Sequence, residues 1–189
     1  MGSQSKPETN AAIQGGAVDI LRQGETLLNA VDDDQYAQIV EPAFRASIGA
    51  HYRHCLEYFQ LLLDGANDGE VDYDRRQRDV LIETDRFAAL NLTRDLIGRI
   101  EDLDDGALDG EIKAVSKLGY SDEASRRVNS SFARELMYAI SHGVHHYALI
   151  SVMARLAGIG LPEHFGEAPS TVAYQREEAR ARPLNAVSS

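Results

Sequence analysis

Three of the six histidines lie within five residues, in the segment 141–147, which reads Ser-His-Gly-Val-His-His-Tyr. His142 and His146 are four positions apart, so on a helix they lie on the same face. Two imidazoles arranged in this way can bind one divalent metal ion, and a further ligand then has to come from elsewhere in the fold. His145 is directed to the side of that face and is the weaker candidate.

A second pair, His51 and His54, lies far upstream, and His164 stands apart from both clusters. One histidine pair on an apolar helix face is more often a satisfied part of the core than a metal site. Buried neutral imidazoles need partners for both ring nitrogens, and clustered imidazoles repel one another once they are protonated. A shared metal ion solves both problems, so two clusters on inward helix faces favour a metal site.

Four amphipathic segments have the spacing of helices that would position these histidines. Apolar side chains recur at helical intervals over residues 11–31, 47–63, 84–103 and 130–157. The second and fourth segments carry the two histidine clusters, and Ser47 has a residue type that caps helices. The pattern predicts an all-α fold, a four-helix bundle with a long crossover between helices two and three. Such bundles place metal sites in their cores, with ligands from facing helices.

The connecting segments predict little further regular structure. We interpret the polar stretch 66–82 as an ordered crossover, because long loops in compact domains are usually functional or held down. Residues 111–115 and 125–129 have the alternation of a small β-hairpin before the fourth helix. The domain is expected over residues 11–175, with mobile tails at 1–10 and 176–189.

Composition narrows the classes of function. The net charge of −11 argues against general nucleic-acid binding and against anionic membrane surfaces. No apolar run reaches the roughly 18 residues that span a bilayer, and no secretory leader is evident, so we expect a cytoplasmic protein. The single cysteine, Cys55, excludes an intramolecular disulfide, and its place on an apolar stripe favours a core residue over a catalytic thiol.

Two motifs resemble the DinB-like (YfiT-like) metalloenzyme superfamily. Ser47-Ile48 followed by His54-Cys55-Leu56-Glu57 resembles the second helix of that family, and residues 130–136 running into His142 and His146 resemble its fourth-helix ligand pair. Residues 165–171 are similar to one subgroup. The resemblance covers residues 11–175.

The resemblance implies a three-histidine site made by His54, His142 and His146. It would hold one divalent metal ion, zinc, nickel or iron, with open positions for water or substrate. His51 remains an alternative third ligand, because residues 51–54 are similar to the paired-histidine stretch of ergothioneine-synthase DinB-like domains. Glu57 and Glu135 are candidate acceptors for the ligand imidazoles, although solvated helix carboxylates are an equally good interpretation.

The resemblance also implies a function and an oligomeric state. The protein would be a metal-dependent enzyme that acts on a small molecule and uses a low-molecular-weight thiol, and it would form a homodimer. The metal-bound thiol or water would be the nucleophile, giving a thiol transferase or a hydrolase. Gly143 follows His142, so the glutamate of a His-Glu-x-x-His protease is absent. Two alternatives stay open: a non-catalytic metal-binding or sensing module, and a purely structural helical bundle.

Overall fold

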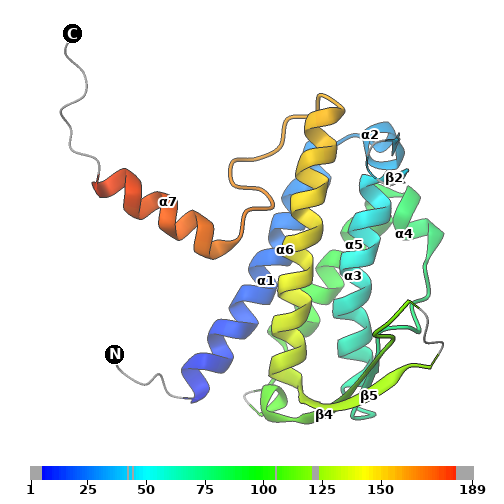
Figure 1. The fold of residues 1–189 in the computed structure, drawn as a ribbon, viewed down its shortest axis with the longest axis vertical. Coiled ribbons are helices and arrows are strands. Elements are labelled where there is room, and N and C mark those ends of the chain that lie inside the picture. Colours follow the sequence, from blue (N-terminus) through cyan, green and yellow to red (C-terminus); the bar gives the residue numbers. More distant parts are fainter. Residues whose placement is uncertain (1–5, 42, 44, 105, 121–123, 182–189) are drawn as a thin grey trace.

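Four long helices form the body of the molecule (Figure 1). The computed structural model describes residues 6–41, 43, 45–104, 106–120 and 124–181. Helix α1 packs against α5 and α6, and α3 also packs against α5 and α6, with α3 and α6 in extensive contact. The four helices are α1 (Lys6–Ala30), α3 (Ile48–Gly65), α5 (Arg86–Glu101) and α6 (Phe132–Leu156).

Each of the three later helices begins at a side-chain cap. Ser47 Oγ accepts the N–H of Ala50 at 2.9 Å at the start of α3, and Ser131 Oγ accepts the N–H of Arg134 at 3.3 Å at the start of α6. Asp85 caps α5 in the same way. These bonds satisfy N–H groups that have no partner within the helix, so they fix where α3 and α6 begin. The cap predicted at Ser47 is confirmed.

The core lies between the four helices. The largest fully buried side chains come from α1, α3, α5 and α6, together with Tyr36 of the short helix α2 (Asp33–Ala37). Burial of these faces is the main stabilising contribution, at roughly 25 cal/mol per Å² of apolar surface. No helix in the described part of the chain has the length and apolar character needed to cross a membrane.

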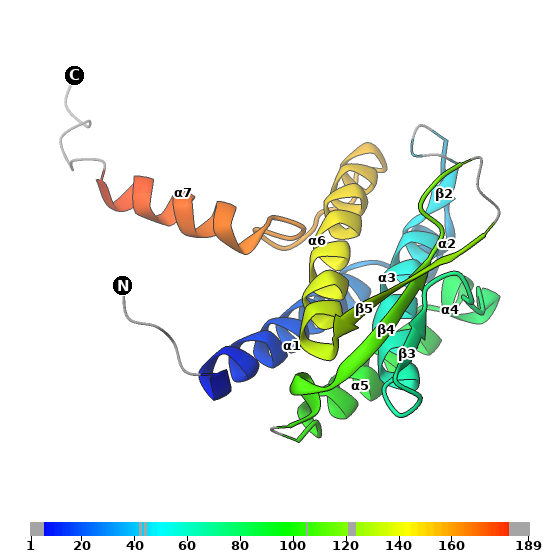
Figure 2. The ribbon, with the colours of Figure 1, turned by 60° about the horizontal axis from the view of Figure 1, so that its bottom comes forward.

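A three-stranded sheet lies at the end of the body where α3 ends and α6 begins (Figures 1 and 2). Its order is β3 (Glu70–Asp72), β4 (Glu111–Ser116), β5 (Arg126–Ser131). Strand β3 is parallel to β4, and β4 is antiparallel to β5. The predicted hairpin before the fourth helix is therefore confirmed, and β5 runs directly into α6.

Short elements complete the chain. Strands β1 (Ile39–Val40) and β2 (Ala46–Ser47) form a two-stranded sheet before α3, and α4 (Val80–Thr84) leads into α5. A short 3-10 helix, η1 (Ala107–Asp109), precedes β4. The last helix, α7 (Pro169–Ala181), has no buried residue and extends away from the body (Figures 1 and 2).

The fold is mostly helical, as expected, but its two small sheets make the all-α description incomplete. Strand β3 was missed inside the predicted crossover because three residues are too few to show a strand period. The expected tails are partly helical: α1 begins at Lys6, and residues 176–181 belong to α7. The rest of those tails, residues 1–5 and 182–189, lies outside the described residues.

Candidate metal centre

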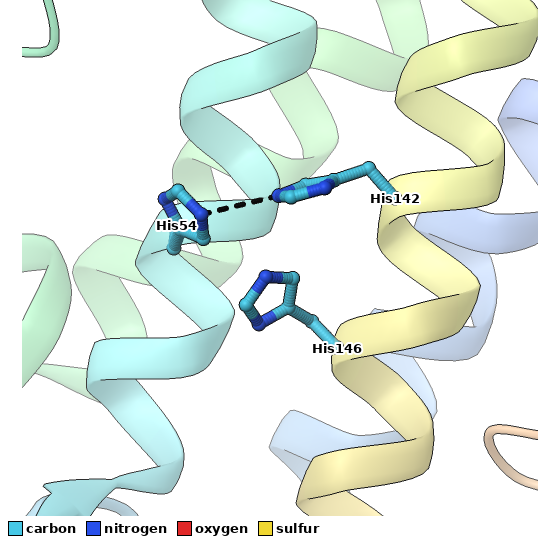
Figure 3. Close-up of side chains that lie close together, drawn as sticks. All are labelled: His54, His142 and His146. Atoms are coloured by element: carbon cyan, nitrogen blue, oxygen red, sulfur yellow. Dashed lines mark hydrogen bonds between the residues drawn. The ribbon is translucent and has the colours of Figure 1, made fainter. Parts of the chain in front are cut away.

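Helices α3 and α6 bring three histidines together. His54 comes from α3, and His142 and His146 come from successive turns of α6, with their rings facing one another (Figure 3). One ring nitrogen from each lies within 4.8 Å of the others, and Nε2 of His54 is 3.1 Å from Nε2 of His142. Imidazole nitrogens are the usual ligands of zinc and suit nickel and iron as well.

His51 lies next to His146. Its Nδ1 is 3.0 Å from Nδ1 of His146, while a ring nitrogen of His146 faces His54 and His142 (Figure 3). Three residues turn a helix by about 300°, so the two side chains leave α3 about 60° apart, and His54 is the one whose ring nitrogen lies within 4.8 Å of both His142 and His146. The structure therefore places His54 with His142 and His146, and it places His51 as a hydrogen-bond partner of His146.

Burial keeps His142 and His146 neutral. Desolvation, followed by the neighbouring histidines, lowers the pKa of His142 to about 4 and that of His146 to about 3. Desolvation also lowers the pKa of His51. These rings are unprotonated at neutral pH, so their lone pairs are available to a cation. The donor set therefore fits a divalent metal ion.

Glu57 lies beside His54 and has one oxygen free. Its Oε1 accepts the backbone N–H of Arg78 at 2.6 Å, whereas Oε2 is buried without a hydrogen-bond partner and lies 3.8 Å from His54 Nδ1. Burial alone raises the pKa of Glu57, but His54, the Arg78 N–H and the charges of Arg53 and Arg76 outweigh it, and the pKa is lowered. Glu57 is thus an ionised acceptor next to a candidate ligand.

Comparison with known proteins bears on the fold. No protein-family model matches the chain. Over 108 residues, 57% of the chain, the sequence is 34% identical to FK506-binding protein 5 of Rhizopus delemar, and the match spans 28% of that protein's length. A solved structure, that of the DinB-like protein YjoA from Bacillus subtilis, has a TM-score of 0.59 and 19% identity, covering 82% of this chain and 98% of that one.

The chain has the DinB-like fold. The resemblance inferred from the residues around His54 and His142 is thus confirmed at the level of the fold. In this DinB-like fold the candidate ligands are on the second and fourth of the long helices, α3 and α6, as the motifs predicted.

Glu135 is placed differently from Glu57 in this DinB-like fold. Its oxygens accept hydrogen bonds from Tyr73 at 2.8 Å and Ser130 at 2.5 Å. Tyr73 stacks on Tyr58 with ring centroids 4.9 Å apart, and Tyr58 stacks on His142 at 3.8 Å. Glu135 is therefore two side chains removed from His142 and supports the aromatic rings beside it.

Cys55, Arg53 and Arg134 carry reactive or charged groups near α3 and α6 but are not among the three clustered histidines. Cys55 is buried at 2% exposure, and burial raises the pKa of its thiol, which fits the core interpretation. Arg53 pairs with Glu83 at 3.3 Å. Arg134 is exposed and lines an open cavity of about 730 Å³ between the sheet and the start of α6.

Two residues near the site were missed by sequence reasoning. Tyr138 lies one turn before His142 on α6, and its ring centroid is 6.0 Å from that of His142. The spacing of four residues was a signal that could have found it. Arg76 donates from Nη1 to His54 Nδ1 at 2.7 Å, but it lies in a segment without periodicity, so no sequence pattern pointed to it.

Proposed function

We propose that this protein is a metal-dependent enzyme in which α1, α3, α5 and α6 act as a four-helix bundle that holds one divalent metal ion on His54, His142 and His146. The observation that carries the proposal is the convergence of three imidazoles from two facing helices, with nitrogens within 4.8 Å. Zinc, nickel and iron are the candidate metals.

The proposed chemistry is thiol transfer to a small molecule. A divalent ion with open coordination positions lowers the pKa of a thiol or water bound to it and so supplies a nucleophile near neutral pH. The protein's own residues would orient the ligands: His51 Nδ1 lies 3.0 Å from His146 Nδ1, and Glu57 Oε2 lies 3.8 Å from His54 Nδ1, which accepts from Arg76 in this structure. Such acceptors fix which ring nitrogen carries the proton. The alternative reaction is hydrolysis by a water molecule that the metal ion activates.

We also propose that the protein is a cytoplasmic homodimer. Exposed apolar side chains on α6 support self-association, because they would be covered in a dimer. They are Met137, Val152 and Leu156, with exposures of 52%, 54% and 59%.

Metal content is the first test. The full chain, purified without a metal-affinity column, should carry close to one divalent ion per chain, measured by plasma mass spectrometry. His54→Ala and His142→Ala should each lose it, because two imidazoles hold a divalent ion far more weakly than three. Their circular dichroism spectra should remain helical.

Absence of metal in the unmodified chain, even after loading with zinc, nickel or iron, would refute the proposal. Metal binding without turnover of any thiol and electrophile pair would instead favour the non-catalytic metal-binding or sensing role.

A further inference from the structure

We propose that Arg76 recognises a carboxylate on the substrate, so that the site takes a small acidic molecule through the guanidinium of Arg76 and a second donor group, such as a thiol, through the metal. The inference rests on the proposed function and names its substrate class.

The segment that carries Arg76 is tied down on both sides. It connects β3 to α4 and has no regular structure of its own. Before Arg76, the Tyr73 hydroxyl donates to Glu135, and Ser125 Oγ donates to Asp74 Oδ2 at 2.6 Å. After it, the backbone N–H of Arg78 donates to Glu57. These anchors hold Arg76 against α3, with its guanidinium at the histidine cluster.

The charge of Arg76 lacks a close carboxylate partner. Among the described residues, no carboxylate oxygen lies within 4.0 Å of its guanidinium, and its Nε–H is buried without a hydrogen-bond partner. The other arginines with well-shielded side chains differ: Arg53 pairs with Glu83 at 3.3 Å and Arg86 pairs with Asp33 at 2.9 Å. An imidazole nitrogen cannot neutralise a guanidinium, so Arg76 remains available to an anion.

The hydrogen bond between Arg76 and His54 conflicts with metal ligation. An imidazole that gives its Nε2 lone pair to a cation carries its proton on Nδ1. That N–H would face Arg76 Nη1, which is also a donor, whereas Glu57 Oε2 lies 3.8 Å away as a buried acceptor without a partner. A ligating His54 therefore pairs with Glu57, and Arg76 is released.

A carboxylate matches the hydrogen-bond donors of the Arg76 guanidinium once it is released from His54. The planar guanidinium presents five N–H donors in a fork that binds a carboxylate through two parallel hydrogen bonds. Three imidazole ligands leave the double positive charge of the ion uncompensated, and Glu57 is already shared with Arg53 and Arg78. The surroundings of the released guanidinium therefore favour an anionic substrate.

The test compares two small thiols, one that ends in a carboxylate and one that ends in a hydroxyl. The full chain is loaded with Co²⁺ and titrated with 3-mercaptopropionate or 2-mercaptoethanol, and binding is followed by the thiolate-to-cobalt charge-transfer absorption. The unmodified protein should bind the acidic thiol at least about tenfold more tightly, and Arg76→Gln should remove most of that preference, because a charge-assisted bond is lost.

Two variants control for charge and folding. Arg78→Gln removes the same charge two positions along the segment, from an exposed side chain, and should keep the preference. Arg76→Lys keeps the charge without the fork and should retain only part of it, and it gives the answer if Arg76→Gln does not fold. An unchanged preference in the Arg76 variants, with cobalt bound, overturns the role of Arg76 and leaves the metal site standing. Failure of the unmodified protein to bind cobalt overturns the proposed function and this inference together.

Discussion

At the scale of single residues, two of the three candidate ligands have a polar side chain beside their second ring nitrogen. His146 turns Nδ1 to His51 at 3.0 Å, and His54 has Glu57 Oε2 within 3.8 Å of its Nδ1. A ligand imidazole whose N–H has an acceptor is held in one tautomer and one orientation, which strengthens its bond to the ion. His51 and Glu57 are therefore expected to tune affinity without contacting the metal.

The first prediction separates a supporting role for His51 from ligation. His51→Ala should keep a site for one ion per chain but weaken its affinity about tenfold to a hundredfold, the usual effect of losing such a partner. Competition with a chromophoric chelator measures the affinity. His145→Ala, which changes an exposed histidine of α6, is the matched control and should leave it unaltered. Complete loss of metal in His51→Ala would make His51 the third ligand.

At the scale of elements, the long helices were predictable because their apolar faces repeat over four or more turns. The cap at Ser47, the hairpin and the pairing of His142 with His146 also followed from local spacing. Strand β3 and the placement of Arg76 did not, since both depend on contacts with segments distant in the chain, such as the pairing of Val71 with Ala114. Which of His51 and His54 lies beside both α6 ligand candidates likewise depends on how α3 is rotated against α6.

Two glycines of α1 give the second prediction. A Cβ at Gly24 would overlap the hydroxyls of Tyr52 and Tyr147, whereas a Cβ at Gly15 would meet nothing within 4 Å. Gly15→Ala should raise the free energy of unfolding by about 0.5–1 kcal/mol, through helix propensity. Gly24→Ala should lower it by about 1–3 kcal/mol, through overpacking. Urea denaturation measures both, and stabilisation by Gly24→Ala would contradict the close packing of α1.

At the scale of the whole molecule, the neutral histidines link folding to pH. The pKa values of His142 and His146, about 4 and 3, lie below the ordinary value of 6.5 that applies to the unfolded chain. Between these values the unfolded chain binds more protons than the folded one. The stability that these two neutral histidines contribute is therefore fully present above about pH 6.5. It is lost as the pH falls towards their pKa values in the folded chain.

The third prediction is the size of that loss in the metal-free protein. Each ring contributes a slope of at most about 1.4 kcal/mol per pH unit, reduced for the partly exposed His142 by solvent screening. Urea denaturation at pH 7, 6 and 5 should show the decline, and His142→Asn should make it shallower. Equal slopes in the two proteins would mean that folding does not lower the pKa of His142, so that the ring takes up a proton as readily in the folded chain as in the unfolded chain.

The separation of 88 residues between His54 and His142 has a consequence for the lifetime of the fold. An ion shared by these side chains is a reversible cross-link across α3 and α6, and closing a loop of that length costs about 4 kcal/mol of chain entropy. The link can form only after the two helices have met, so it slows unfolding and leaves the rate of folding almost unchanged. A chelator that removes the ion would then raise the rate of unfolding and shorten the lifetime of the native state, while the rate of folding would stay almost the same.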